Sequence, residues 1–171
     1  MEQKPSTTQI ALKWGIISAL ASIVLSTVMY MTDLWKNTVV SSVVGLAVGI
    51  AILVMAMKEF KDQNGGFMTF GEGFGLGMLA SVISAVISTL YSQIYMKFID
   101  PTFPEKMKDF QYEQMEAQGL SDAQIEQAIS MSEKFTTGGL SFLFPLLGAI
   151  LFSLIMTLIV AAIMKKNKPV F

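Results

Sequence analysis

Few side chains in this sequence could do chemistry, and three of them are charges at the edges of apolar segments: Lys13, Glu72 and Asp100. The chain has no Cys, which excludes a thiolate nucleophile and Cys-ligated zinc or iron–sulfur clusters. It has no His either, so the usual general base and the commonest metal ligand are missing. Ser–His, Cys–His and His-metal hydrolases are therefore excluded. The sequence predicts no catalytic residue, no cofactor and no metal site.

The three edge charges allow two interpretations. Lys13 and Glu72 should face the same side of a membrane at similar depth, where they could form an ion pair between the first and third spans. Alternatively, Lys13 reaches lipid headgroups and Glu72 is simply hydrated. Asp100 precedes Pro101 and so should end a helix. Its carboxylate could contact a divalent cation, but it lacks the clustered oxygens that such ions prefer.

Four long apolar runs must position these charges. They contain no charged side chain and cover Trp14–Thr32, Asn37–Met57, Gly73–Met96 and Phe135–Met164. A helix needs roughly 20 apolar residues to cross a bilayer, and continuously apolar runs can satisfy their backbone in lipid only as helices. The sequence therefore predicts an all-α, polytopic four-helix membrane bundle. We expect spans at about 11–32, 38–57, 73–97 and 139–164.

Composition supports a single membrane domain over residues 1–171, because 53% of the residues are hydrophobic and only 15% are charged. The formal net charge of −1 gives no basic stripe, so no nucleic-acid partner is expected. Every cation is Lys and none is Arg. Two-pronged capture of a phosphate or carboxylate, which Arg performs best, should therefore not be central.

Lysine placement predicts the orientation. The leading segment, the second loop and the tail carry seven Lys, whereas the short first loop carries one, Lys36. The seven are Lys4, Lys13, Lys58, Lys61, Lys165, Lys166 and Lys168. By the positive-inside rule both termini should be cytoplasmic.

A long acidic loop, about residues 100–136, should then lie outside the cytoplasm. Pro104 and Glu105 favour a helix start. Gly119 favours a stop, and Ser121 with Gln124 has the form of a capping box. The loop is predicted to be two short helices joined at Gly119–Leu120. It could serve as a solvated lid or, alternatively, as a ligand site.

Each span also carries a row of small residues, and helices in lipid pack closely at such rows. The packing candidates on the second and third spans are Gly45, Gly49, Gly71, Gly73, Gly75, Gly77, Ser81 and Ser84. The first span has such a row at Ser18, Ser22 and Ser26, and the fourth has one at Ala149, Ser153, Thr157 and Ala161. The alternative interpretation is that the serine faces line a polar path through the membrane.

Several short motifs, in their order and spacing, resemble a known family. They are Ala11–Gly15, Gly65–Gly71, Phe98–Pro101, Gly119–Ser121 and Gln124–Glu126. With these motifs the whole chain resembles a bacterial family of small membrane proteins classed as domain of unknown function 4199. The resemblance implies four spans and carries no assigned activity, cofactor or site.

These observations favour a non-enzymatic accessory or structural protein of a bacterial cytoplasmic membrane. Its expected partners are the lipid bilayer, a second copy of the chain or other membrane proteins. The alternative is a small transporter or channel that works as an oligomer. A membrane enzyme is the third hypothesis, and it would depend on Glu72, Asp100 or the acidic loop.

Overall fold

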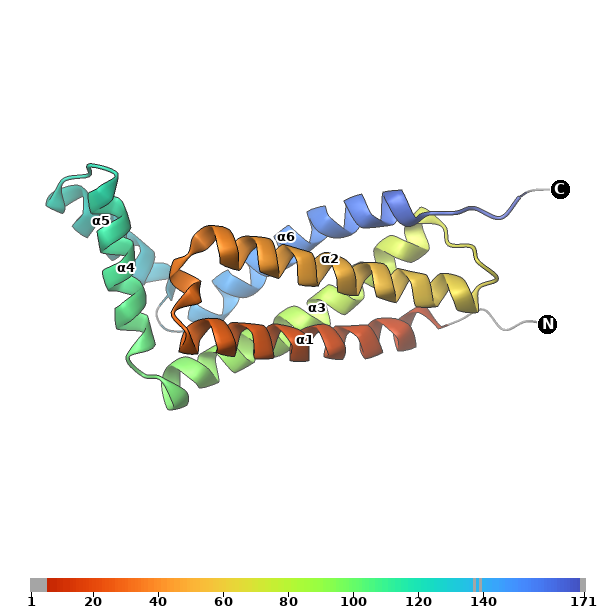
Figure 1. Ribbon diagram of the computed structural model, residues 1–171, viewed down its shortest axis with the longest axis horizontal. Coiled ribbons are helices and arrows are strands. Elements are labelled where there is room, and N and C mark those ends of the chain that lie inside the picture. The colour runs from red at the N-terminus through yellow and green to blue at the C-terminus, as the bar shows by residue number, and fades with distance from the viewer. Residues whose placement is uncertain (1–5, 137, 139, 170–171) are drawn as a thin grey trace. The chain divides into compact units, whose positions relative to one another are not determined.

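A computed structural model describes residues 6–136, 138 and 140–169 (Figure 1). In these residues the chain forms six α-helices, a 3-10 turn (η1) and a π-helical segment (η2). Their bounds are α1 Thr7–Met31, η1 Leu34–Lys36, α2 Thr38–Gln63, α3 Phe70–Ile94, η2 Tyr95–Ile99, α4 Phe103–Ala117, α5 Asp122–Thr136 and α6 Leu140–Met164. The predicted all-α class is confirmed.

Four segments are long and apolar enough to cross a membrane: α1, α2, α3 continued by η2, and α6. This confirms the four-span prediction. Helix α2 runs six residues beyond the predicted end at residue 57, because charged side chains such as Lys58 and Glu59 end an apolar run but are still good helix formers. Gly139, the expected start of the fourth span, and Lys4 lie outside the described residues.

The chain falls into two compact units. The first unit comprises residues 1–88 and 149–171, and the second comprises residues 89–148. Helices α3 and α6 contribute residues to both. The expectation of a single membrane domain stays a prediction.

The core of the first unit draws on all four apolar helices. Its buried residues are Ile10, Ala11, Trp14, Leu53, Ala56, Met57, Phe60, Met68, Leu76, Ala80, Val160 and Ala161. The start of α1, the connection from α2 to α3 and the end of α6 lie at one end of this unit (Figure 1). Large apolar side chains cover its outer surface, for example Val39 at 72% exposure and Ile163 at 76%. Such an outer surface suits lipid rather than water.

The second unit contains the predicted helical hairpin. Helices α4 and α5 are joined at Gly119, whose φ of 82° is a left-handed conformation that glycine adopts without strain. The Gln124 half of the capping box is present, because the backbone N–H and the hydroxyl of Ser121 both donate to Gln124 Oε1, at 3.0 and 3.1 Å. The hairpin buries Ile125 and Ile129, and Lys108 on α4 pairs with Glu133 on α5 at 2.8 Å. The two-helix prediction is confirmed.

Candidate functional site

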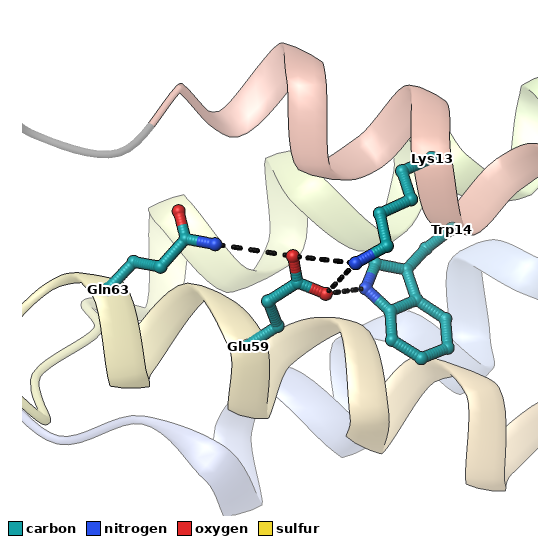
Figure 2. A network of polar contacts seen from close by, with 4 residues as sticks. All are labelled: Lys13, Trp14, Glu59 and Gln63. Atoms are coloured by element: carbon teal, nitrogen blue, oxygen red, sulfur yellow. Dashed lines mark hydrogen bonds and ion pairs between the residues drawn. The ribbon is translucent and has the colours of Figure 1, made fainter.

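A polar network joins the start of α1 to the end of α2 in the first unit (Figure 2). Lys13 Nζ lies 2.8 and 3.0 Å from the two carboxylate oxygens of Glu59. The indole Nε1 of Trp14 donates to Glu59 Oε2 at 2.6 Å, and Gln63 Nε2 donates to Glu59 Oε1 at 3.2 Å. One carboxylate therefore receives three donor side chains. The Glu59 side chain is 23% exposed and that of Lys13 is 55% exposed, so the ion pair is partly shielded from solvent.

This network corrects the proposed pair between Lys13 and Glu72. The carboxylate of Glu72 instead accepts from the backbone N–H of Thr69 at 2.8 Å and from its hydroxyl at 2.9 Å. The N–H of Glu72 donates back to Thr69 Oγ1 at 3.3 Å. This is a reciprocal capping box at the start of α3. Glu72 thus orders its own helix terminus, and Lys13 pairs with a different helix.

Sequence reasoning missed Glu59 because it was counted with the second loop rather than with a span. The Trp14 side chain that shares this carboxylate is buried, at 8% exposure. A usable signal was present. Two helices joined by a short loop run antiparallel, so the start of the first span should meet the end of the second, where Glu59 is the nearest acid to Lys13.

Asp100 is held locally, and no ion is needed to explain its position. Its carboxylate accepts from the N–H of Thr102 at 3.1 Å, from the Thr102 hydroxyl at 2.6 Å and from Lys106 Nζ at 2.9 Å. The hydrogen bond from the Thr102 hydroxyl, followed by that from Lys106, lowers the pKa of Asp100 below its ordinary value. In the part of the chain that the structure describes, no group of three or more acidic side chains could hold a metal ion. Asp100 therefore orders the turn into α4.

Two of the predicted packing glycines on α3 make close contacts with other elements. A Cβ added at Gly77 would lie 2.5 Å from Thr157 Cγ2 on α6, and one at Gly73 would lie 2.8 Å from Met68 Cε and 3.4 Å from Ala161 Cβ. Serine joins this contact surface as well, since the Ser84 hydroxyl donates to the Ser18 hydroxyl on α1 at 3.1 Å. The Cβ at Gly77 would also lie 3.2 Å from Leu53 Cδ2 and from Met57 Cε on α2, so the small-residue face of α3 packs against α1, α2 and α6.

The other four glycine candidates do not pack in this way. A Cβ at Gly45, Gly49, Gly71 or Gly75 would meet no described atom within 4 Å. On α3 the reason is geometric, because residues two apart lie about 200° apart around a helix. The pair Gly71 and Gly75 therefore faces away from the pair Gly73 and Gly77. On α2 the reason is that Gly45 and Gly49 line a cavity.

This cavity, which has a volume of about 250 Å³, is the candidate functional site. All four apolar helices line it, near their midpoints. Its lining residues are Trp14, Ser18, Ser22, Gly45, Leu46, Gly49, Ile50, Ile52, Leu53, Ala56, Ala80, Ser81, Ser84, Ala85, Ser88, Ala149, Phe152, Ser153 and Met156. The lining includes six serines and no charged side chain. Its most exposed large residues are Phe152 on α6 and Leu46 and Ile50 on α2. Helices α2 and α6 thus supply the lining residues that also reach the outer surface of the unit.

The serine hydroxyls of the cavity differ in how they are satisfied. Ser84 donates to Ser18, and Ser153 donates to the carbonyl of Ile150 in its own helix at 2.9 Å. The hydroxyl of Ser88 is buried and has no hydrogen-bond partner among the described residues. A buried polar group without a partner costs free energy comparable to a lost hydrogen bond. Ser88 therefore offers an unmet hydrogen-bonding group in the lining of the cavity.

Comparison with protein families identifies the chain. The family described as protein of unknown function DUF4199 matches residues 13–166. The chain therefore belongs to this family. No curated protein and no solved structure shows significant similarity to it.

Proposed function

We propose that this DUF4199 protein is a non-enzymatic accessory protein of a bacterial cytoplasmic membrane, and that it acts by binding a small uncharged molecule in the cavity between its four membrane helices. The cavity is the observation that supports the proposal. Small-molecule sites are concave and mostly apolar, with a few convergent polar groups that fix orientation. The cavity between the four helices has these properties.

The chemistry of the lining favours an uncharged ligand with one hydrogen-bonding group. A charged molecule would lose its hydration without gaining a partner of opposite charge, because no charged side chain lines the cavity. The free hydroxyl of Ser88 can donate to a ligand oxygen and accept from a ligand hydroxyl. Apolar residues such as Leu53 and Met156 would surround the rest of the molecule.

The proposed orientation places both termini in the cytoplasm. The start of α1 and the end of α6 share one end of the first unit with the connection from α2 to α3 (Figure 1). That end carries most of the lysines, and the positive-inside rule assigns such an end to the cytoplasm. Cysteine introduced at Ser6 and at Asn167 should react with a membrane-impermeant thiol reagent only after cells are opened. Labelling of either site in intact cells would contradict the orientation.

Binding can be tested with Trp14, because its indole lines the cavity. In a Trp35→Phe background Trp14 is the sole tryptophan, and 8-bromooctanol, an uncharged quencher, should reduce its fluorescence in nanodiscs. We expect saturable quenching by this alcohol and only weak, linear quenching by 8-bromooctanoate, which carries a charge.

Two glycine variants separate binding from partition into lipid. Gly49→Leu fills the cavity, and Gly75→Leu adds the same side chain at an exposed site outside it; neither added Cβ meets a described atom within 4 Å. Saturable quenching should disappear in Gly49→Leu and persist in Gly75→Leu. If Gly49→Leu retains the same saturable quenching, the cavity does not bind the alcohol and the proposal fails.

A second candidate is transport of a small solute by an oligomer of the chain. The position of the serine-lined cavity near the helix midpoints favours it, because carriers place their substrate sites near the bilayer midplane. Proteoliposomes that contain the protein should then show uptake of small uncharged solutes such as glycerol, and Gly49→Leu should reduce it. Absence of protein-dependent flux in every oligomeric state would leave the binding proposal standing alone.

A further inference from the structure

The connection from α2 to α3 and the tail after α6 are paired in the first unit. The N–H of Met68 donates to the carbonyl of Lys166 at 2.9 Å, and the N–H of Lys166 donates to the carbonyl of Met68 at 2.7 Å. This reciprocal pair is an isolated antiparallel bridge. The tail is therefore fixed beside the loop, because each segment satisfies the other's backbone groups.

Side chains strengthen this pairing from both sides. Met68 is completely buried and lies against Gly73 in the first turn of α3. Lys61, near the end of α2, donates through Nζ to the carbonyl of Met164 at 3.2 Å. A cation at this position also complements the negative end of the α6 dipole. Three helix ends are thus tied together at one place.

Two lysines are held over one aromatic ring at this bridge. Lys166 Nζ lies 5.5 Å from the centroid of the Phe67 ring, and Lys168 Nζ lies 5.9 Å from the same centroid. In the described part of the chain neither ammonium group forms an ion pair with an acid. We call Phe67, Met68, Lys166 and Lys168 the loop–tail platform.

The charges around the platform leave an excess of cations. Two of the three nearby acids are already engaged, since Glu59 receives Lys13 and Glu72 caps α3 through Thr69. Counting Lys13, Lys58, Lys61, Lys165, Lys166 and Lys168 against Glu59, Asp62 and Glu72, the described residues at this end carry six positive and three negative groups. The like charges of Lys166 and Lys168 are brought together with no acid between them, which suits an anionic partner.

The position of the platform next to the ends of two membrane helices favours a lipid as the anionic partner. Lys166 follows the apolar helix α6 by two residues, and Phe67 precedes the apolar helix α3 by three. Both therefore lie at the level where a bilayer presents its headgroups, and an aromatic ring suits that interface. We infer that the loop–tail platform binds the headgroup phosphate of an anionic phospholipid, with Lys166 and Lys168 contacting the phosphate and Phe67 packing against the adjoining glycerol. Lysine serves here as a point charge, a role that does not require Arg.

The test compares full-length protein in nanodiscs of phosphatidylglycerol and of phosphatidylcholine. Competition between the two lipids, read by native mass spectrometry of the released protein, should show preferential retention of phosphatidylglycerol. In the double variant K166Q/K168Q the preference for phosphatidylglycerol should be about 30-fold weaker, which is the effect expected when two lysines near an anionic surface lose their charge. K166R/K168R keeps both charges and should keep most of the preference.

Matched controls make the result decisive. K97Q/K134Q removes two lysines outside the platform and should leave the preference unchanged. Inorganic phosphate added to phosphatidylcholine nanodiscs should not protect the protein against thermal unfolding, whereas phosphatidylglycerol should. Equal retention of both lipids by the native protein, or equal loss of preference in K97Q/K134Q and K166Q/K168Q, would overturn the inference. Protection by inorganic phosphate alone would also overturn it, because the site would then recognise a free anion.

Discussion

Helices α2 and α3 both carry the GxxxG spacing, and the first unit uses it in opposite ways. On α3, Gly73 and Gly77 permit close contact, Gly77 with Thr157 on α6 and with Leu53 and Met57 on α2, and Gly73 with both α6 and the loop before α3. On α2, Gly45 and Gly49 touch no described side chain and form a wall of the cavity. Helix α2 is tied to α1 by the carboxylate of Glu59, and it meets α3 away from its own glycines, at Leu53 and Met57. The same spacing can therefore build a contact or leave a space, depending on what the facing helix presents.

The strongest test of the contrast between α2 and α3 is to replace one glycine on each helix by alanine, which adds one methyl group. Gly77→Ala should destabilise the protein by about 1–3 kcal/mol, because the new Cβ would lie 2.5 Å from Thr157 Cγ2 and force α6 to move. Gly45→Ala should be neutral or stabilising by up to about 1 kcal/mol, because alanine favours a helix more than glycine does. Unfolding by a denaturing detergent, followed by circular dichroism, measures both changes.

Gly75→Ala is the matched control on α3 itself, since its Cβ would meet no described atom within 4 Å. It should behave as Gly45→Ala does. If Gly77→Ala is as stable as Gly75→Ala, the two faces of α3 are equivalent and the contrast between α2 and α3 is lost.

The polar attachment of α2 should give the next largest effect. Glu59→Leu leaves the buried indole N–H of Trp14 without its acceptor and should cost about 1–3 kcal/mol of unfolding free energy. Glu59→Gln retains an acceptor for Trp14 but loses the ion pair with Lys13. That pair is more exposed, so the loss should be at most about 1 kcal/mol. The emission maximum of Trp14 in a Trp35→Phe background would report the loss of the indole hydrogen bond.

Charge reversal distinguishes the observed pair from the one that the sequence suggested. Lys13→Glu should be destabilising, and Glu59→Lys in the same chain should recover part of the loss. Glu72→Lys combined with Lys13→Glu should give no recovery, because Glu72 caps α3 through Thr69. If Glu72→Lys restores the stability of the Lys13→Glu variant and Glu59→Lys does not, α1 is held to α3 rather than to α2.

Much of the fold follows from local patterns in the sequence. The four spans were predictable because an apolar run of that length has one stable form in lipid. The α4–α5 hairpin was predictable because its turn at Gly119 and its capping box at Ser121 are fixed by residues a few positions apart. Local signals set these elements, and the structure bears them out.

The cavity and the polar network were less predictable, because they depend on which helix faces pack against each other. The glycines at 71, 73, 75 and 77 give two interleaved pairs, and no local signal says which pair faces the bundle. Gly45 and Gly49 look like a contact in sequence, yet the facing side of α6 supplies Ala149 and Ser153 across a cavity. The partner of Lys13 could be found only by placing the end of α2 beside the start of α1. The missing information is thus tertiary in each case.

The smallest expected effects on stability come from two buried hydroxyls that lack a partner among the described residues, Ser88 at the cavity and Thr157 against Gly77. Thr157→Val removes an unsatisfied group where no ligand can reach it, since its side chain is fully buried in a helix contact. It should therefore leave stability unchanged or raise it by up to about 1 kcal/mol, and it should not alter quenching of Trp14 by 8-bromooctanol. Ser88→Ala should be similarly benign for the empty protein but should weaken binding of the alcohol about tenfold, the value of one hydrogen bond. If Ser88→Ala and Thr157→Val bind 8-bromooctanol equally well, the Ser88 hydroxyl does not contact the alcohol. The contrast between α2 and α3 would then concern helix packing alone.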